Sequence, residues 1–483
     1  MEICVTLMSG QAAWVRAQPE SRMDQIKRDA QKALKVGLYA LVNPSGTLLK
    51  PWNRAKEVGL KDGSAVTGVV RRVDLAGGRF ARSFALLRAD GQVVSWGHPS
   101  CGDSSRAQLQ LRDVAKVFSS CGAFAAIRCD GTVVTWGDAN CGGNCRRVQQ
   151  ELRDVTQICA ANVPPYRPII EAAFAALRSD GRVVTWGSEV CGGDSRNVQE
   201  QLSGVVELCA TCSGAFAALR SDGRVVTWGE DREVQGLWWV AAAPREALYA
   251  TDLSGTPLAC RPNSDDPANP ARRVARLFAN LRSFAALLSD GSVVTWGCQI
   301  AGGDSSQVQH QLFGVKEIAA VDFAFAALRE DGQVVTWGNP KLGSDSCAVQ
   351  AQLVEVQQLA GTASSFAALR SNGSVVTWGQ AKAGGDSSRV QDQLRQVQHI
   401  VAAESAFLAL RKDGRTVSWG RADIGGDSSE VQDELRDVIS ISSTRHAFAA
   451  IRADGRVITW GSAHEGGDSS SVKMQLLDAF GIS

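Results

Sequence analysis

The sequence lacks the features that mark most membrane, secreted and nucleic-acid-binding proteins. None of its apolar runs is long enough to span a bilayer. Its first twenty residues contain no basic leader followed by an apolar stretch, so we expect no secretory signal. The net charge of +1 gives no electrostatic reason to expect nucleic acid as a partner. These absences predict a cytoplasmic, or alternatively nuclear, protein whose 13 cysteines are mostly reduced thiols.

Histidine is also scarce, which limits the chemistry that the chain can perform. The five histidines share no position in the pattern described below; they are His98, His310, His399, His446 and His464. No Ser–His–Asp set can be assembled from the sequence. The pairs Cys209/Cys212 and Cys141/Cys145 have metal-like spacing, but each lacks a matching second pair. We therefore expect small buried thiols, and no catalytic residue, metal or cofactor.

What the sequence contains in abundance is a repeat with a basic period of 41 residues. Its clearest mark is a tryptophan followed by glycine, found nine times, at Trp96, Trp136, Trp186, Trp228, Trp296, Trp337, Trp378, Trp419 and Trp460. One unit reads "FAALRSNGSVVTWG" (Phe366–Gly379), two apolar runs around Asn-Gly, which is a strong hairpin signal. A third run, such as "VQQLAG" from Val356, precedes each hairpin. Three short strands per unit predict a propeller blade, with an open β-solenoid as the alternative.

Both faces of this predicted hairpin are apolar. With residues 372–373 as a two-residue loop, Leu369 lies opposite Val376 and Ala367 lies opposite Trp378. An antiparallel sheet with one wet face would alternate apolar and polar residues, and this one does not. We therefore expect each ribbon to be covered on both faces, as in a radial stack of small sheets.

The segment "GGDSS" lies between successive hairpins, at Gly302, Gly384, Gly425 and Gly466, and in variant form elsewhere. It suggests a phosphate-binding loop, but the lysine of a P-loop is missing. We interpret it as structural. The two glycines reverse the chain after the tryptophan strand. The second serine and a glutamine three residues later, such as Ser388 and Gln391, are predicted to form the capping box of a short helix.

Residues 1–72 contain no repeat and carry 12 Lys+Arg against 6 Asp+Glu. Two strands are expected around Ser9-Gly10. A helix follows, with apolar residues at helical spacing between Met23 and Leu34 and a stop at Gly37, and then two more strands. This strand–strand–helix–strand–strand order is typical of an α+β β-grasp domain.

The repeat resembles that of the regulator of chromosome condensation family. The matching motifs are "FAALRSDGRVVTWG" and a preceding "VKEIAA"-type run. The short period is closer to the beta-lactamase inhibitor protein II branch. The resemblance covers residues 73–483 and implies a β-propeller, usually of seven blades. Here nine units are clear, and a degenerate tenth is placed at Val240–Cys260 with Ser254-Gly255 as its turn. We expect nine or ten blades, and a C-terminal segment, "LLDAFGIS", that pairs near Val73 to close the ring.

The first 72 residues resemble ubiquitin, and their opening aligns without gaps from Met1 to Gly10. In ubiquitin-like domains an exposed apolar patch recruits receptors. Met8 and Val69 match two centres of that patch, and the third falls near Leu41 or Val42. Ordinary surface apolar residues are the alternative interpretation. Because Gly77-Gly78 runs directly into the first hairpin, we expect a permanent domain rather than a releasable modifier.

Two insertions interrupt the repeat, at 162–171 and 230–273. Insertions in repeat proteins map to loops and often to a binding face. Tyr166, Trp238 and Trp239 lie in these insertions, and such aromatic residues often anchor interfaces. The alternative is that the two tryptophans fill the core of a degenerate blade.

Taken together, the sequence predicts a multidomain, non-enzymatic scaffold or adaptor for protein–protein interaction. Its resemblance to ubiquitin implies a link to ubiquitin-pathway receptors, and we expect neither nucleic acid nor membrane as a partner. The resemblance of the repeat implies an alternative, a guanine-nucleotide exchange factor or regulator of a small GTPase. The candidate protein-binding residues are Met8, Leu41, Val69, Tyr166, Trp238 and Trp239.

Overall fold

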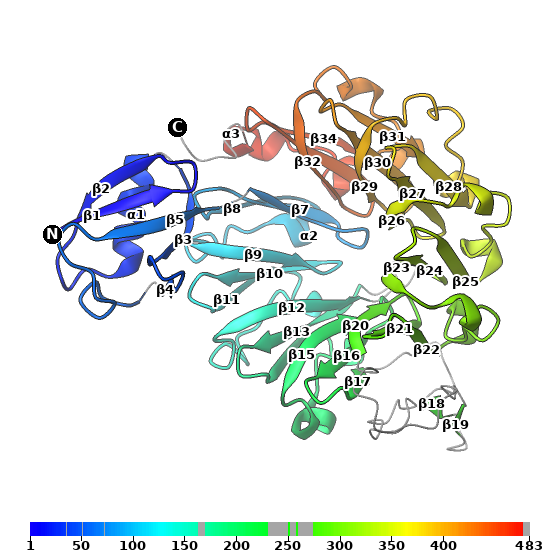
Figure 1. Ribbon diagram of the computed structural model, residues 1–483, viewed down its shortest axis with the longest axis horizontal. Coiled ribbons are helices and arrows are strands. Elements are labelled where there is room, and N and C mark those ends of the chain that lie inside the picture. The colour runs from blue at the N-terminus through cyan, green and yellow to red at the C-terminus, as the bar shows by residue number, and fades with distance from the viewer. Residues whose placement is uncertain are drawn as a thin grey trace.

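A five-stranded mixed sheet with one helix across it forms the start of the chain, which we call the head (Figure 1). The sheet order is β2-β1-β5-β3-β4, and β1 is parallel to β5. The elements are β1 Glu2–Leu7, β2 Ala12–Arg16, α1 Met23–Leu34, β3 Leu38–Val42, β4 Leu48–Leu49 and β5 Ala65–Val70. The predicted strand–strand–helix–strand–strand order is present with one strand more, because residues 38–49 form two strands, β3 and the two-residue β4, rather than one. The computed structural model describes residues 1–34, 36–50, 52–71, 73–162, 170–229, 250–251, 257–258 and 274–476 of the 483.

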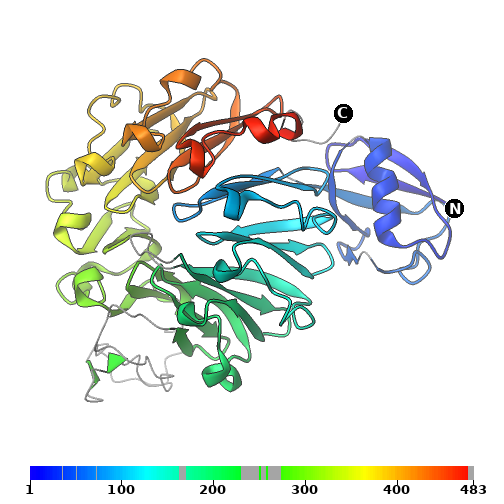
Figure 2. The same ribbon diagram turned by 180° about the vertical axis from the view of Figure 1, so that it is seen from behind.

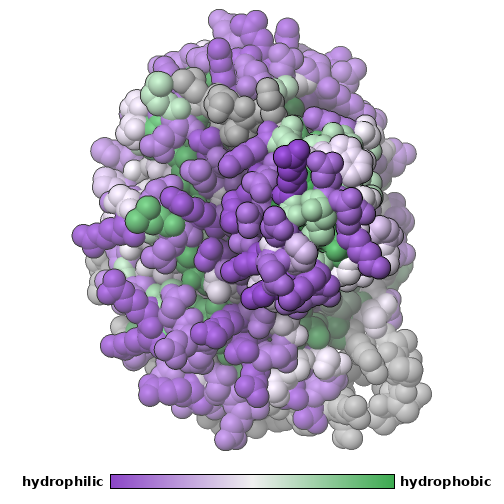
Figure 3. Space-filling model, turned by 90° about the vertical axis from the view of Figure 1, so that its left-hand side faces the viewer, coloured by the Kyte–Doolittle hydropathy of each residue, from purple (hydrophilic) through white to green (hydrophobic). Residues whose placement is uncertain are grey.

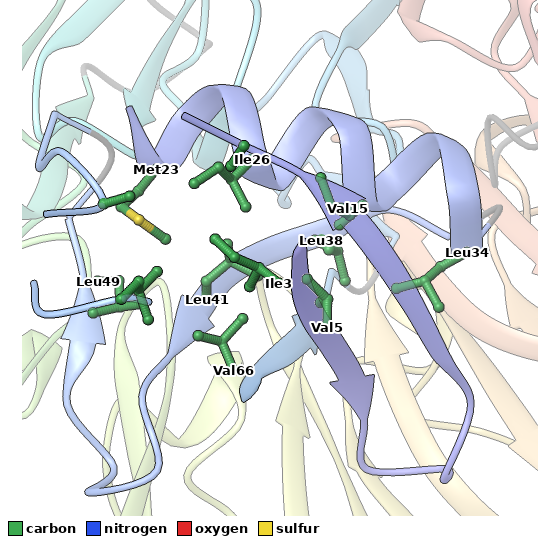
Figure 4. Packing of buried hydrophobic residues seen from close by; sticks show 14 of the residues in the cluster. Ile3, Val5, Val15, Met23, Ile26, Leu34, Leu38, Leu41, Leu49 and Val66 are labelled. Atoms are coloured by element: carbon green, nitrogen blue, oxygen red, sulfur yellow. The ribbon is translucent and has the colours of Figure 1, made fainter. Parts of the chain in front are cut away.

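The head has its own hydrophobic core between α1 and the sheet. Met23, Ile26, Ala30 and Leu34 are buried at helical spacing along α1, as predicted. Figure 4 shows several of these side chains pointing into the same space as Ile3 and other strand residues. This core contains no residue of the repeat, so the head is built around apolar contacts of its own.

Nine three-stranded antiparallel sheets follow the head, and each is a blade built from one continuous stretch of chain. Blades 1 to 3 are β6 Asp74–Ala76, β7 Ser83–Leu87 and β8 Val93–Gly97; β9 Val114–Ser119, β10 Ala123–Arg128 and β11 Val133–Gly137; and β12 Val155–Asn162, β13 Ala172–Arg178 and β14 Val183–Gly187. Blades 4 to 6 are β15 Val205–Ala210, β16 Ala215–Arg220 and β17 Val225–Gly229; β20 Val274–Ala279, β21 Ser283–Leu288 and β22 Val293–Gly297; and β23 Val315–Val321, β24 Ala324–Arg329 and β25 Val334–Gly338. Blades 7 to 9 are β26 Val356–Gly361, β27 Ser365–Arg370 and β28 Val375–Gly379; β29 Val397–Ala402, β30 Ala406–Arg411 and β31 Thr416–Gly420; and β32 Val438–Ser443, β33 Ala447–Arg452 and β34 Val457–Gly461.

The segments between blades contain only short helices. These are α2 Pro99–Gly102, α3 Lys473–Leu476, and the 3₁₀ helices η1 Ala139–Cys141, η2 Glu189–Cys191, η3 Arg196–Gln201, η4 Gln299–Ala301, η5 Gln309–Gln311, η6 Pro340–Leu342, η7 Gln350–Gln352, η8 Ala381–Ala383, η9 Ala422–Ile424, η10 Ser429–Val431, η11 Ala463–Glu465 and η12 Ser470–Val472. Within the described ranges, no helix combines the length and the apolar character needed to cross a membrane.

The register of each blade hairpin differs by one residue from the predicted register. Phe366, not Ala367, lies opposite Trp378. The reason is the loop, which has three residues, 371–373, because the Arg370 N–H donates to the Ser374 carbonyl and the Gly373 N–H returns to the Arg370 carbonyl. Three-residue hairpin loops of this kind end in a residue with positive φ, and Gly373 has a φ of +80°.

The corrected register places the two large aromatic residues of each blade side by side. The rings of Phe366 and Trp378 stack with centroids 5.3 Å apart, and the pair recurs in all nine blades. Every residue of β27 except the last is buried. The prediction that both faces of the ribbon are covered is therefore confirmed.

The GGDSS segment packs one blade against the next. Gly384 has a φ of +92°, and a Cβ atom there would lie 2.6 Å from the ring of Phe407 in the following blade. The carbonyl of Gly384 accepts a hydrogen bond from the indole of Trp419, also in the following blade. The first glycine is therefore required both by its backbone conformation and by the closeness of the neighbouring blade.

The predicted capping box is wrong in its partners. Gln391 pairs with the first serine, Ser387, whose Oγ donates to Gln391 Oε1 at 2.8 Å. The Gln391 amide then donates to the carbonyl of Val375 in β28. The acid supplies the local cap, because Asp386 Oδ1 accepts from the Ser388 N–H at 2.9 Å. The motif is structural, as predicted, but its glutamine ties the loop to the sheet rather than to a helix.

Blade 9 packs directly against blade 1, so the blades form a closed ring (Figures 1 and 2). The Arg445 N–H donates to the Ala81 carbonyl at 2.7 Å, the same link that Glu404 makes to Arg445 one blade earlier. The indole of Trp96 donates to the Gly466 carbonyl at 3.1 Å, across the same junction. The open-solenoid alternative is therefore wrong, and closure needs no strand beyond the three that blade 1 supplies. Of the predicted closing segment, residues 477–483 lie outside the described residues.

Nine blades complete the ring in the described part of the chain. Blades 4 and 5 share a hydrophobic cluster in which Leu219 and Val225 pack with Leu277, Phe284 and Trp296. Because these blades touch, no tenth blade stands between them. In the second insertion the structure describes only a two-stranded ladder of β18 Ala250–Thr251 and β19 Pro257–Leu258. The predicted Ser254-Gly255 turn lies outside the described residues.

Substituting Trp378 with phenylalanine should lower the free energy of unfolding by about 2 kcal/mol, because the buried Gly343 carbonyl loses its indole donor. Trp136 provides a matched control, since its indole N–H has no partner in the structure. Trp136→Phe loses similar apolar area but no hydrogen bond, so urea denaturation should show about half the effect. Equal losses at both positions would contradict the role assigned to the indole.

Candidate functional site

The turns that join the first and second strands of the blades lie side by side at one mouth of the ring, which we call the turn face. Leu281 donates its N–H to Asp322 O, Asp322 donates to Ala363 O, and Ala363 donates to Glu404 O. The same chain of bonds continues through Arg445 to blade 1. Side chains on these turns are therefore held at regular spacing by backbone contacts.

Five charged side chains gather on the turn face where the ring closes, and we call them the closure cluster. They are Arg82, Glu404, Arg445, His446 and Glu465. His446 Nε2 lies 2.5 Å from Glu404 Oε2, and His446 Nδ1 lies 3.1 Å from Glu465 Oε2. Arg445 donates to Glu404 at 2.8 Å, and Arg82 lies 3.3 Å from Glu465. The cluster therefore connects blades 8, 9 and 1.

The electrostatics of the closure cluster favour its charged forms. Burial would raise the pKa of Glu404, but hydrogen bonds from His446 and Arg445 outweigh burial and lower that pKa to about 2. Burial alone would lower the pKa of His446, yet its hydrogen bond with Glu404 and its ion-pair contact with Glu465 raise it above the ordinary value. The pKa of Glu465 is lowered because contact with His446 outweighs the effect of burial.

A second ion pair crosses the mouth of the ring. Arg79, which precedes β7 in blade 1, lies 3.2 Å from Asp322 in blade 6 and also donates to the Thr362 carbonyl in blade 7. Burial raises the pKa of Asp322 even though Arg79 lies beside it. Since blades 1 and 6 are not neighbours in the ring, the Arg79 side chain occupies the centre of the turn face.

The contacts of the closure cluster limit what its histidine can do. Both ring nitrogens of His446 contact carboxylates, so the histidine is not placed to activate a hydroxyl or a thiol. In the described part of the chain no three His, Cys, Asp or Glu side chains are grouped to hold a metal ion. Arginine and histidine beside carboxylates at a ring mouth can instead make charge-assisted hydrogen bonds to a partner.

The head places the candidate patch residues in different environments. Met8 is 94% exposed at the β1–β2 turn, and Val69 is half-buried on β5. Leu41 is only 2% exposed and points into the head core, as Figure 4 shows. Leu41 is therefore wrong as a surface contact. Val42, which lies opposite Thr67 in the sheet, is half-buried instead and is the better third member of the patch.

The surface around the head contains no large apolar area. Figure 3, which views the molecule from the side that carries the head, shows a mainly hydrophilic face with small, separate hydrophobic areas. Met8 and Trp14 are the most exposed of the large apolar residues in the head. A partner that binds this face would therefore use a small apolar contact surrounded by polar groups.

The head is held against the hairpin turns of blades 1 and 2. Lys27 on α1 is buried and lies 3.1 Å from Asp113, just before β9. A Cβ atom on Gly37 would lie 1.7 Å from the Ala89 carbonyl oxygen, so the two backbones touch. Arg71 is buried in the same junction, and its Nη2 lies 3.3 Å from Cys129 Sγ. These contacts fix the head relative to the ring.

Three of the sequence-predicted residues cannot be placed. Tyr166, Trp238 and Trp239 lie outside the described residues, so their role stays a prediction.

Sequence reasoning missed the closure cluster, although a signal was present. The turn before the phenylalanine reads "TASS" in blade 7 but "TRHA" in blade 9, where charge replaces small residues. A comparison of the units at this turn, rather than at the hairpin, would have indicated it.

Comparisons with known proteins show that this chain is similar to several propellers of known structure. No protein-family model matches the sequence, and no curated protein matches it. Yeast RCC1 (Prp20) bound to Kap60 matches with 17% identity and a TM-score of 0.38, over 62% of this chain and 80% of that one. The ectodomain of the receptor kinase CR4 from Physcomitrella patens matches with 16% identity and a TM-score of 0.36, over 63% and 73%. The computationally designed Ika8 protein matches with 14% identity and a TM-score of 0.35, over 72% and 96%.

Proposed function

We propose that this protein is a non-enzymatic scaffold that presents two protein-binding surfaces in fixed relative positions. One surface is the turn face around the closure cluster, and the other is the exposed patch of the head around Met8. The observation that carries the proposal is the rigid junction between head and ring. A head joined by a loose linker would bind its partner independently, whereas a docked head holds one partner at a set distance from another.

The head suggests the class of one partner. Its resemblance to ubiquitin, together with the exposure of Met8 beside half-buried Val42 and Val69, supports binding to receptors of ubiquitin-like domains. Such receptors contact a small apolar patch, and this patch is small. A cytoplasmic or nuclear location accords with this partner class.

The ring suggests a partner with its own mixed charges. The arginine, histidine and carboxylate groups of the turn face are already paired with one another. A protein with complementary charges can form new ion pairs with them, so that no buried charge is left without a partner. The repeat motif also keeps a second candidate function open, nucleotide exchange on a small GTPase. An exchange assay with wild-type protein across a panel of small GTPases tests it, and no acceleration would reject it.

Substituting Gly37 with alanine should release the head from the ring while both parts stay folded, because the new methyl group clashes with the Ala89 backbone. A zero-length cross-link between Lys27 and Asp113, detected by mass spectrometry, reports docking and should fall at least fivefold. Gly46→Ala is the control without a clash: nothing lies within 4 Å of a Cβ atom there, and its φ of +84° adds only a backbone cost within the head, so the cross-link should persist.

Affinity purification with the full-length chain then tests the scaffold. The Met8→Asp variant should lose the partners of the head and keep those of the ring. Gly37→Ala should keep both sets of partners, because head and ring stay in one chain, but cross-linking of a head partner to a ring partner should fall, because their relative positions are no longer fixed. Retention of every partner by Met8→Asp would remove the head from the proposed function.

A further inference from the structure

Two buried thiols lie together in blade 2, in contact with the described ends of the first insertion. Cys121 is in the turn between β9 and β10, and Cys141 is the last residue of η1, after β11 of the same blade. Their Sγ atoms are 3.8 Å apart. Cys121 is 6% exposed and Cys141 is fully buried. Cys145, which shares a metal-like spacing with Cys141 in the sequence, donates from its Sγ to Gln149 Oε1.

Both thiols contact the end of the insertion that spans 162–171. Cys121 Sγ donates to the Glu171 carbonyl and Cys141 Sγ donates to the Ile170 carbonyl, each at 3.6 Å. The backbone of the same turn contacts the beginning of the insertion, since the Cys121 N–H donates to Asn162 Oδ1 at 2.7 Å. The thiol pair and its turn therefore hold both described ends of the insertion.

This anchor replaces the link found elsewhere on the turn face. In blade 7 the corresponding turn N–H, that of Ala363, donates directly to the backbone of the next blade. The positions of the two thiols in that blade are occupied by Ala363 and Ala383. Since alanine suffices there, the fold does not require a thiol at either position. Cysteine recurs at the Cys141 position as Cys101 in blade 1 and Cys191 in blade 3, but among the nine units only blade 2 has cysteine at the Cys121 position, so the pairing is local to the blade where the insertion begins.

The Cys141 thiol is held in its protonated form, which makes it a donor. Close contact with Cys121, together with burial, raises the pKa of Cys141 well above its usual range. A protonated S–H can donate to a carbonyl, whereas a disulfide sulfur cannot. The attachment of residues 170–171 therefore depends on the redox state of the pair.

We propose that Cys121 and Cys141 form a dithiol modification site, at which oxidation by a low-molecular-weight disulfide releases the end of the insertion from blade 2. One cysteine loses its proton, and its thiolate attacks the disulfide to give a mixed disulfide and a released thiolate that takes up a proton to become a free thiol. The second sulfur then displaces the second thiol, so that one S–S bond forms and the two cysteine protons leave with the two released thiols. The sulfurs must close from 3.8 Å to about 2.05 Å, and both carbonyls lose their donors. The site is independent of the function proposed above.

The experiment uses the full chain and oxidised glutathione as the probe. Exposed Cys347 serves as the internal standard, since its glutathionylation shows that the oxidant is effective. We expect peptide mapping to find a Cys121–Cys141 cross-link, and we expect amide exchange at residues 170–173 to rise at least tenfold. The Cys141→Ser variant keeps a hydroxyl donor but cannot form the cross-link, so the same treatment should leave its exchange unchanged.

A second variant keeps the proposal testable if Cys141→Ser fails to fold. Cys121→Ala combined with Cys141→Ala reproduces the residues of blade 7 and removes both donors, so its exchange at 170–173 should be high with or without oxidant. The proposal is overturned if Cys347 is modified and no Cys121–Cys141 cross-link forms. It is equally overturned if the cross-link forms and exchange at 170–173 stays at the level of the reduced protein.

Discussion

Gly466→Ala should destabilise the protein by about 4 kcal/mol, through two effects that add. Gly466 has a φ of +103°, which costs an L-residue about 1–2 kcal/mol. A Cβ atom there would also lie 2.6 Å from the ring of Phe84 in blade 1, and overpacking of a filled core costs roughly 1–3 kcal/mol. Phe84 is fully buried against Trp96, so it cannot move away easily.

Two matched substitutions separate these effects in urea denaturation. Gly10→Ala has a φ of +88° but meets nothing within 4 Å, so only the backbone cost of about 1–2 kcal/mol should appear. Gly384→Ala creates the same clash inside the ring, with Phe407, and should match Gly466→Ala. If Gly466→Ala were no worse than Gly10→Ala, blades 9 and 1 would not be in contact, and the ring would be open in solution.

His446→Gln should lower the free energy of unfolding by about 2 kcal/mol near pH 5.5 and by much less at pH 9. Hydrogen bonds to charged groups contribute about 1.5–3 kcal/mol each, and His446 contacts two carboxylates at the closing junction. The pKa of His446 is raised in the folded state, so its contribution is complete below the ordinary value of 6.5. That contribution is lost as the pH rises through the raised pKa.

At acidic pH the contribution of Glu404 to stability changes in the opposite direction, because it decreases as the pH falls. The pKa of Glu404 is lowered from 4.5 to about 2 in the folded state. Its contribution is therefore complete above pH 4.5 and is lost as the pH falls toward about 2. The closure cluster should stabilise the ring most between about pH 4.5 and 6.5, the window set by these two groups.

The control for this prediction is His310→Gln, a change at an exposed histidine far from the cluster, which should alter stability by less than about 0.5 kcal/mol at any pH. Denaturation series of the three proteins from pH 4 to pH 9 provide the measurement. A difference between wild type and His446→Gln that stays constant across this range would show that the protonated histidine is not what stabilises the junction.

The hairpin register shows how much of a blade the sequence pattern can predict. Asn-Gly between two apolar runs predicts a turn, and the turn is present at residues 371–373. The pattern cannot distinguish a two-residue loop from a three-residue loop, because both use glycine at positive φ. One residue of difference moves Trp378 from opposite Ala367 to opposite Phe366. The aromatic stack between strands, visible only in three dimensions, decides the register.

The candidate patch residues of the head show a second limit of prediction from sequence. The exposure of Met8 follows from its place in a turn, and the sequence predicts it. Leu41 and Val42 are adjacent in one strand, so a shift of one residue exchanges the buried and the outward position. The pairing of β3 with β5, which assigns Val42 to the outer face beside Thr67, is set by a bulge at Leu38/Ala40 that no local pattern reveals.

By itself the sequence determined the repeat, the three strands of each unit, the covering of both faces and the structural role of GGDSS, because each follows from local turn chemistry and the alternation of side chains. The tertiary structure alone decided the closure of the ring, the number of blades in it, the docking of the head, the closure cluster and the meeting of Cys121 with Cys141. These depend on contacts between residues far apart in the chain. The repeat does not indicate where its first and last copies meet, since the GGDSS segment at Gly466, which closes the ring, is the same as those at Gly302, Gly384 and Gly425.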